Sequence, residues 1–326
     1  MMYDKLTSKK RKLDSYRPLD DALVRNLEDW FRIELTYTSN AIEGNTLTRH
    51  ETALVVEKGL TVGGKTLVEH LEATNHARAL DWVTAQIKRS PQDLTEKDIL
   101  HIHNIILKGI DDQNAGRYRN IPVRISGSTV ILPNPRKVPT LMEDFIIWLK
   151  NSFELHPIEL ALEAHYQLVT IHPFVDGNGR TARLLMNMIL LMSGYPSAII
   201  SKNDRLAYIG SLEKAQLGGT KDDYKKVIIK AVDRSLDIYL KSVHGKNYHN
   251  IIEEGTLLKI GALADRAGVR NSTIRHWTKE GLLEIAEASS AGYHLYSPQT
   301  LSRIKQIQAL QHQRLTLFEI KNKLKV

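Results

Sequence analysis

Residues 172–183 have the sequence HPFVDGNGRTAR. A glycine-rich turn lies between two apolar runs, which predicts a turn that opens a buried helix. Glycines let an anion approach the backbone closely, and the first N–H groups of a helix have no intrahelical partners. Two arginines three residues apart suit bidentate contact with phosphate oxygens. This stretch therefore predicts an anion-binding site at the start of a helix.

The same stretch also contains groups that could act on a bound phosphate. His172 belongs to the residue type that can take a proton from a hydroxyl near neutral pH. Asp176 could hold Mg2+, which prefers one or two carboxylates together with phosphate oxygens. Glycines and arginines at a helix start are also common in an ordinary cap with solvated charges. Because all these residue types fall within one short stretch, we favour a site for phosphoryl or nucleotidyl transfer.

The stretch resembles the signature of the Fic family, His-x-Phe-x-(Asp/Glu)-Gly-Asn-Gly-Arg-x-x-Arg, at every defining position. The resemblance implies a mainly α-helical domain that transfers AMP from ATP to a Ser, Thr or Tyr hydroxyl of a target protein. It implies His172 as the general base and Asp176 as the Mg2+ ligand. It also implies a set of nucleotide-binding residues: Gly177, Asn178, Gly179, Arg180, Arg183 and Tyr208. Of these, Arg183 reaches the γ-phosphate and Tyr208 lies near the adenine. Rare relatives use other phosphate-containing donors, so the donor stays open between ATP and these.

A second informative stretch is TSNAIEGNTLT at 38–48. On spacing alone, Ser39 caps a short helix and Glu43 follows about one turn later, as in an ordinary capping box. The stretch also resembles the Fic inhibitory motif, (Ser/Thr)-x-x-x-Glu-(Gly/Asn), at Ser39, Glu43 and Gly44. The resemblance implies that Glu43 pairs with Arg183 and keeps it from the γ-phosphate, so that the enzyme is inhibited by its own chain. In some relatives the glutamate instead helps water to remove AMP from a modified target, and the sequence leaves both roles open.

The rest of the first 245 residues predicts helices, with one exception. Thr95 and Asp98 predict a capped helix start, and residues 156–171 and 181–194 predict two buried helices at the centre of the domain. Residues 116–139 are rich in β-branched residues around a central Ser-Gly-Ser, so we predict a β-hairpin there. In the resemblance this hairpin is the flap that positions the target segment by strand pairing.

The C-terminal part of the chain is more basic than the rest. Residues 256–326 carry eleven Lys/Arg and five Asp/Glu, so they hold +6 of the total charge of +8. Residues 257–283 predict a helix-turn-helix with Gly268 at the turn and Ser272 as the cap of the second helix. A short aromatic strand, a helix near Pro298 and a final helix follow.

This order of elements resembles the DNA-binding domain of MerR-type regulators, a winged helix-turn-helix. The resemblance implies a wing around Gly292-Tyr293-His294, where His294 stands in place of the arginine that the family commonly has. It also implies a set of residues that contact DNA on the recognition helix, the wing and the backbone-binding surface: Thr273, Arg275, His276, Tyr293 and Arg303. A helix-turn-helix that binds protein instead is the alternative.

We therefore predict a mainly α protein with a Fic domain at 1–245, a linker at 246–255 and a small winged helix-turn-helix domain at 256–326. A hydrophobic share of 42% and a charged share of 25% are typical of soluble globular proteins. The chain has no Cys, which excludes disulfides and thiolate metal sites. We expect no secretory signal, no membrane span and a cytoplasmic location.

The predicted function is an enzyme of protein AMPylation that uses ATP and Mg2+. A transcription regulator that senses nucleotide and binds DNA through its C-terminal domain is the alternative from another class. The predicted partners are a target protein with a hydroxyl side chain and DNA. The oligomeric state is open, with a homodimer as one alternative.

Overall fold

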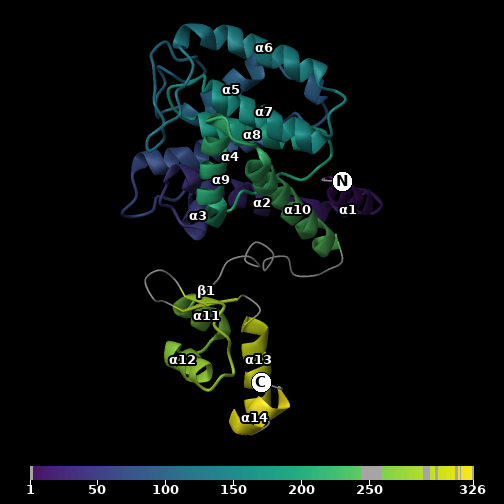
Figure 1. Cartoon of the computed structure of the whole chain (residues 1–326), viewed down its shortest axis with the longest axis vertical. Coiled ribbons are helices and arrows are strands. Elements are labelled where there is room, and N and C mark those ends of the chain that lie inside the picture. The colour runs from purple at the N-terminus through teal and green to yellow at the C-terminus, as the bar shows by residue number, and fades with distance from the viewer. Residues whose placement is uncertain are drawn as a thin grey trace. The chain divides into compact units, whose positions relative to one another are not determined.

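The computed structural model describes residues 3–243, 258–288, 294–297, 300–312, 315 and 317–324. The chain divides into two compact units, Met1–Lys246 and Asn247–Val326, and each is described by itself (Figure 1). The predicted linker at 246–255 lies outside the described residues. Among the helices of the described ranges, none is both long and apolar enough to cross a membrane.

The larger unit is built from helices, which confirms the predicted mainly α class. Its helices are α1 (Asp4–Asp14), α2 (Asp21–Glu43), α3 (Arg49–Lys58), α4 (Leu67–Ala85), α5 (Glu96–Leu107), α6 (Val138–Asn151), α7 (Pro157–Ile171), α8 (Asn178–Met192), α9 (Arg205–Gln216) and α10 (Asp222–Val243). Single 3-10 turns lie at Pro91–Asp93, Pro135–Lys137 and Lys202–Asp204.

The core of this unit is the pair of helices that flanks the 172–183 stretch. Helix α8 packs along α7 at the centre of the unit, and its residues 180–190 are all buried, as the continuous apolar run predicts. Helices α4 and α5 also contact α8, and α2 packs on both α4 and α8. The predicted cap of α5 is confirmed, because Thr95 and Asp98 form a capping box. The loop between α7 and α8 is therefore held between two rigid elements.

Helix α2 differs from the prediction in where it begins. The Asp20 side chain caps it by accepting from Leu23 N, so the helix runs through the predicted inhibitory stretch and ends at Glu43. Gly44 terminates it with a φ of 106°, a conformation that favours glycine. The prediction that Ser39 caps a short helix is therefore wrong, because Ser39 lies inside this longer helix. Ser39 and Glu43 are instead four residues apart on one helical face.

Residues 116–139 form a chain reversal, but no strand pairing is assigned within them. The predicted β-hairpin is therefore wrong in its hydrogen bonding. Two side chains, one from within this segment and one from α9, use backbone groups that a ladder needs. Arg119 donates to the Pro133 carbonyl at 2.7 Å, and Thr129 N donates to the Glu213 carboxylate at 3.1 Å. The prolines of this segment also have no N–H to donate to a ladder, so they disfavour strand pairing as well.

The smaller unit is a helix-turn-helix with a small sheet, as predicted. Its elements are β1 (Leu258–Lys259), α11 (Ile260–Ala267), α12 (Asn271–Lys279), β2 (Glu287–Ala288), β3 (His294–Tyr296), α13 (Thr300–His312) and α14 (Leu317–Lys323). The strand order is β1-β3-β2, with both pairs antiparallel. Gly268 makes the turn at a φ of 65°. Helix α12 begins at Asn271 after Arg270, so the prediction of Ser272 as its cap is wrong.

A core of its own stabilises the smaller unit. Ile274 and Trp277 project from α12 into a buried cluster with Leu263 of α11, Tyr296 of β3 and Ile304 of α13. The Tyr296 hydroxyl lies 3.0 Å from the Thr278 hydroxyl, which links β3 to α12. Because α12 buries one face in this way, its remaining residues are left on the surface.

Candidate active site

His172 lies at the end of α7 in an uncommon backbone conformation. Its φ of 52° makes it the only described residue other than glycine with a positive φ. Arg119 stabilises this turn, because its Nε donates to the His172 carbonyl at 2.7 Å. The ring Nδ1 lies 3.3 Å from the Val169 carbonyl oxygen, which can only accept. Nδ1 therefore carries the proton, and Nε2 is left unprotonated in the neutral ring.

The surroundings of His172 favour its neutral form. Burial lowers the pKa of His172, and the charge of Arg119 acts in the same direction, while the Val169 carbonyl, Glu43 and Asp176 oppose them. A neutral imidazole with a free Nε2 is the form that a general base needs at pH 7. The geometry of His172 therefore suits removal of a proton from a nearby hydroxyl.

The start of α8 presents three backbone N–H groups that have no place in the helical ladder. The first intrahelical bond runs from Thr181 N to the Gly177 carbonyl at 2.9 Å, so the N–H groups of residues 178–180 precede it. Gly177 has a φ of 77° and precedes the helix. The Asn178 side chain turns back and bonds both Phe174 N and Phe174 O, at 3.0 and 2.9 Å. Asn178 thus shapes the loop with its side chain and contributes only its N–H to the anion-binding position.

His103 also supports this loop, although no sequence motif identifies it as a residue of the site. Its Nδ1 accepts from Gly116 N at 2.9 Å, so its Nε2 carries the proton and donates to the Asp176 carbonyl at 3.0 Å. The His103 ring stacks on Phe174 with ring centres 3.6 Å apart. A side chain at Gly177 would press against this ring, since a Cβ there would lie 3.3 Å from His103 Cδ2. The backbone contacts join segments that are distant in the sequence, so no local pattern reveals them.

Arg183 is bound by the last turns of α2. Its Nε donates to the Ser39 hydroxyl at 3.0 Å, and its Nη2 donates to the Ser39 carbonyl at 3.0 Å and to Glu43 Oε1 at 2.7 Å. The Arg183 side chain is 6% exposed, while that of Glu43 is 37% exposed. The Glu43 carboxylate lies over Gly179, where an added Cβ would collide with it. A carboxylate thus occupies the space directly above the start of α8.

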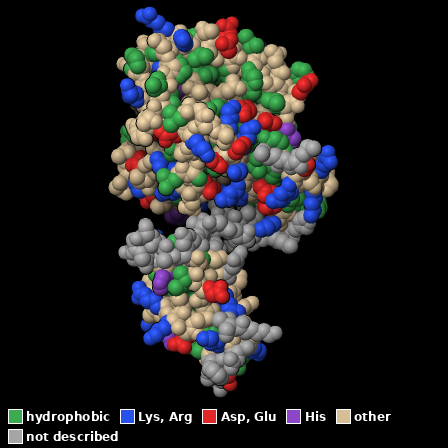
Figure 2. Space-filling model, viewed as in Figure 1, with side chains coloured by type: hydrophobic (Ala, Val, Ile, Leu, Met, Phe, Trp, Pro, Cys, Tyr) green, Lys and Arg blue, Asp and Glu red, His purple; other side chains and the backbone are tan. Residues whose placement is uncertain are grey.

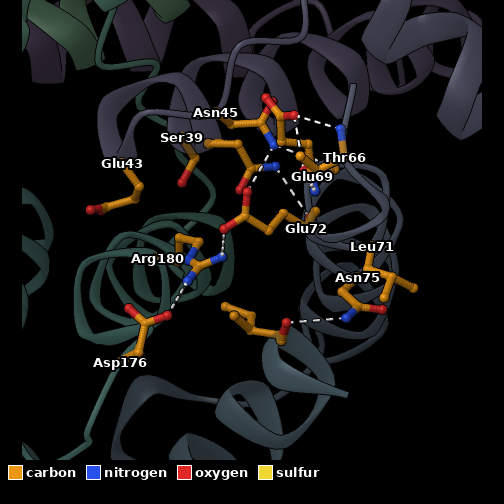
Figure 3. Close-up of polar contacts among 12 residues, drawn as sticks. Ser39, Glu43, Asn45, Thr66, Glu69, Leu71, Glu72, Asn75, Asp176 and Arg180 are labelled. Atoms are coloured by element: carbon orange, nitrogen blue, oxygen red, sulfur yellow. Dashed lines mark hydrogen bonds and ion pairs between the residues drawn. The ribbon is translucent and has the colours of Figure 1, made fainter. Parts of the chain in front are cut away.

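Arg180 points in a different direction, toward α4 (Figure 3). Its Nη1 donates to Glu72 at 2.8 Å and its Nη2 to Asp176 at 3.0 Å. Glu72 in turn accepts from Asn45, at 2.9 Å, in the segment that follows α2. Glu72 is a second residue that the sequence analysis missed, because an acidic residue on a helix carries no local signal of its partner. It balances the charge of the buried Arg180 and fixes its direction.

Asp176 is the member of the loop that is most open to solvent. Its side chain is 67% exposed, and one of its oxygens, Oδ2, accepts from Arg180. No cluster of three or more His, Cys, Asp or Glu side chains with metal-binding geometry occurs among the described residues. A single exposed carboxylate beside a phosphate site fits Mg2+, which takes most of its other ligands from phosphate oxygens and water.

Tyr208 lies in a different place from the one that the resemblance implied. It is 2% exposed, and its hydroxyl lies 2.7 Å from His165 Nε2. The guanidinium carbon of Arg183 lies 6.0 Å from the centre of the Tyr208 ring. Tyr208 therefore lies behind Arg183 and not on a surface that an adenine could cover.

The predicted DNA-binding residues fall into three groups. Arg275 and His276 are exposed on α12, and Thr273 is half-buried there. Arg303 donates to the Leu282 carbonyl at 3.4 Å and to the Leu324 carbonyl at 3.4 and 3.5 Å. The structure therefore does not bring Arg303 to the surface of α12 that carries Arg275 and His276. Tyr293 lies outside the described residues.

Comparison with known proteins agrees with the two units. Residues 93–190 match the model of the Fic/DOC family, and residues 258–326 match that of the MerR HTH family regulatory proteins. Curated relatives called protein adenylyltransferase Fic include one from Nematostella vectensis, 38% identical over 243 residues, and one from Culex quinquefasciatus, 37% identical over 240 residues. These matches cover 74% and 73% of this chain but 56% and 47% of the relatives. The chain thus spans about half the length of these curated relatives.

Solved structures give the same result. Fic-1 from C. elegans is 30% identical with a TM-score of 0.69, over 75% of this chain and 72% of that one. A Fic domain containing signaling protein from Bacteroides thetaiotaomicron is 29% identical with a TM-score of 0.68, over 76% of this chain and 99% of that one. The protein therefore has the fold and the loop of a Fic domain joined to a MerR-type helix-turn-helix. It belongs to the Fic family.

Two buried histidines make the stability of the larger unit depend on pH. Burial lowers the pKa of His76 and of His165 from the ordinary 6.5 to about 3, and the charge of Arg183 contributes in both cases. The unfolded chain binds protons at these residues below pH 6.5 while the folded chain does not. Their contribution is therefore fully present above pH 6.5 and is lost as pH falls toward 3. Two protons at about 1.36 kcal/mol each give a decrease of about 2.7 kcal/mol per pH unit below 6.5.

Urea denaturation at pH 8.0, 7.0, 6.0 and 5.0 measures this decrease. We expect a nearly constant free energy of unfolding from pH 8.0 to 7.0 and a steep fall between 6.0 and 5.0. A free energy that stays constant down to pH 5.0 would show that these histidines are not held neutral by burial.

Proposed function

We propose that this protein transfers AMP from ATP to a Ser, Thr or Tyr hydroxyl of a target protein. The observation that carries the proposal is the arrangement around the 172–183 loop. A neutral His172 with a free Nε2 precedes a helix start that offers free N–H groups and a buried Arg183. A base beside a polyphosphate site is what nucleotidyl transfer to a hydroxyl requires. We also propose that it acts in the cytoplasm, since a chain without Cys suits a reducing compartment.

In the proposed reaction, the target hydroxyl oxygen attacks the α-phosphorus of ATP. Its proton passes to His172 Nε2, the new oxygen–phosphorus bond forms, and the bond to the bridging oxygen of the β-phosphate breaks. Pyrophosphate leaves and carries the electron pair of that bond. The N–H groups at the start of α8 would offset negative charge on the phosphates, and Arg180, which here binds Glu72 and Asp176, would add its positive charge. Mg2+ held by Asp176 would supply further charge neutralisation on the phosphate oxygens.

We also propose that α2 inhibits the enzyme through Glu43. A carboxylate is an anion, and that of Glu43 lies above Gly179 and bonds Arg183, as a phosphate group at the same position would. Glu43 and the γ-phosphate would therefore compete for one guanidinium and for one position. Ser39 supports the arrangement by binding Arg183 through both its hydroxyl and its carbonyl.

Labelling with ATP that carries radioactive phosphorus in either the α- or the γ-phosphate distinguishes AMP transfer from transfer of the γ-phosphoryl group. The Glu43→Gly variant, incubated with a protein extract, is expected to label protein when the label is in the α-phosphate and not when it is in the γ-phosphate. The reason is that AMP transfer retains only the α-phosphorus. Label from the γ-phosphate would instead identify a phosphoryl transferase and would contradict the proposal.

The smaller unit supports a second function, binding of duplex DNA. A groove of about 890 Å³ lies between β1, α11, α12 and β3. Apolar residues line part of it, and its charged or titratable residues are Lys259, Arg275, Lys279, His294 and Asp265. Lys and Arg side chains gather on the visible face of this unit (Figure 2). A concave surface with three permanent positive charges and one negative charge suits a phosphate backbone. We therefore propose that residues 256–326 direct the enzyme to DNA or regulate transcription.

Arg275→Ala is expected to weaken binding of a duplex of arbitrary sequence and to reduce the salt dependence of the binding constant by about one phosphate contact. Fluorescence anisotropy at several salt concentrations measures both. Lys305→Ala is the matched control, because it removes the same charge from an exposed position of α13 outside the groove. Equal effects of the two substitutions would show that the groove is not the binding surface.

A further inference from the structure

A chain of buried polar side chains lies behind Arg183. His165 on α7 contacts two tyrosine hydroxyls, with Nε2 2.7 Å from Tyr208 on α9 and Nδ1 2.8 Å from Tyr224 on α10. All three side chains are at most 2% exposed. Three helices are thus joined by hydrogen bonds at one point beneath α8, and the end of this chain faces the Arg183 guanidinium.

The direction of each hydrogen bond in this chain can be assigned. The Tyr224 hydroxyl donates its proton to the Leu162 carbonyl at 2.9 Å, so its oxygen can only accept from His165. His165 Nδ1 therefore carries a proton. Burial lowers the pKa of His165 to about 3, so the ring is neutral at pH 7 and Nε2 has no proton. The Tyr208 hydroxyl must then donate to Nε2.

The consequence for Arg183 follows from this assignment. Because Tyr208 gives its one proton to His165, its oxygen offers only lone pairs to Arg183. Burial raises the pKa of Tyr208, and the charge and hydrogen bonding of Arg183 oppose that rise. The hydroxyl is therefore a fixed dipole whose negative end is open to the charge of the guanidinium, which lies 6.0 Å from the ring centre. Its direction is set by α7, α9 and α10, and not by α2.

We propose that Tyr208 and His165 are positioning residues that hold Arg183 in the direction needed to bind the γ-phosphate, whether or not Glu43 is in place. This inference rests on the proposed function, in which Arg183 binds that phosphate. The contacts of Arg183 with Ser39 and Glu43 belong to α2 and must change when ATP binds productively. An arginine side chain has several rotatable bonds, so a fixed ring and dipole beside the guanidinium preserve its orientation and reduce the entropy lost on binding.

Binding of ATP and of ADP distinguishes this role from a general structural one, since the two ligands differ only in the γ-phosphate. The parent protein carries Glu43→Gly and His172→Ala, so that Arg183 is free and ATP is not consumed. Adding Tyr208→Phe removes one oxygen and keeps the ring. Isothermal titration calorimetry with Mg2+ is expected to show roughly tenfold weaker ATP binding, the scale of one favourable polar contact, and an ADP affinity within twofold of the parent.

Tyr166→Phe in the same parent is the matched control. Tyr166 lies beside Tyr224, with ring centres 6.0 Å apart, but it is not a member of the chain. We expect it to leave the ratio of ATP to ADP affinity unchanged. His165→Leu is expected to reproduce the effect of Tyr208→Phe, because Tyr208 then loses the acceptor of its proton.

Three results would overturn the inference, and they have different meanings. If the parent prefers ATP to ADP and Tyr208→Phe keeps that preference, the positioning role is wrong and the proposed function stands. If the parent itself does not prefer ATP, Arg183 does not bind the γ-phosphate, and the proposed inhibition and this inference both fail. Equal weakening of ATP and ADP binding by Tyr208→Phe would indicate a structural role only and would also overturn it.

Discussion

His172→Ala is expected to reduce AMP transfer by the active form of the protein about 100- to 10,000-fold, the range for loss of a general base. The residue is held in a left-handed turn by Arg119, and its Nδ1 proton is directed to the Val169 carbonyl. The free Nε2 is therefore the group that would accept the proton of the target hydroxyl. Alanine keeps the backbone and provides no acceptor. Initial rates of AMP incorporation, measured in the Glu43→Gly background, give the size of the loss.

The loss should be confined to the chemical step. Because His172 donates nothing to the phosphates in this geometry, ATP affinity measured by calorimetry is expected to change by less than threefold, a small effect on the scale of one hydrogen bond. His101→Ala is the matched control, since it removes an exposed imidazole from α5. Transfer at the full rate by the His172→Ala variant would exclude His172 as the base.

Glu43→Gly is expected to increase AMP transfer about 10- to 100-fold. The Glu43 carboxylate bonds Arg183 at 2.7 Å and lies above Gly179. A hydrogen bond between charged groups contributes about 1.5–3 kcal/mol, and about 1.4 kcal/mol corresponds to a factor of ten in a population. Removal of the carboxylate therefore frees both the guanidinium and the position over α8. The rate of label incorporation from ATP, compared between wild type and variant, measures the increase.

Glu43→Gln separates charge from volume in this prediction. Glutamine retains the size of the side chain and its hydrogen-bonding oxygen, so it is expected to give a rate between those of wild type and Glu43→Gly. Arg183→Ala in the Glu43→Gly background should lower the rate again, because the contact with the γ-phosphate is lost. If Glu43→Gly and wild type transfer AMP at the same rate, the proposed inhibition is wrong.

The parts of the fold that could be predicted are those with local causes. The capping box of Thr95 and Asp98 fixes the start of α5, and the continuous apolar run of α8 identifies it as a central helix. The turn at Gly268 likewise follows from its local sequence. In each case the deciding residues lie within about one or two turns of one another.

The parts that could not be predicted depend on contacts between distant segments. The β-branched residues of 116–139 favour strands, but Arg119 and Glu213 use the backbone groups that a hairpin would need. Tyr208 lies behind Arg183 because its hydroxyl bonds His165 of α7, a tertiary contact without a sequence pattern. Glu72 is matched to Arg180 in the same way. In each case a side-chain contact that local propensity does not encode determined the structure.

The central claim is that the chain transfers AMP with His172 as the base and is inhibited by Glu43. Intact-mass spectrometry after incubation with ATP and Mg2+ tests it on three purified proteins: wild type, Glu43→Gly, and Glu43→Gly with His172→Ala. The account predicts that only the Glu43→Gly protein gains the mass of one or more AMP groups by modifying its own chain. Equal gain by all three proteins, or gain by the protein that lacks His172, would contradict it.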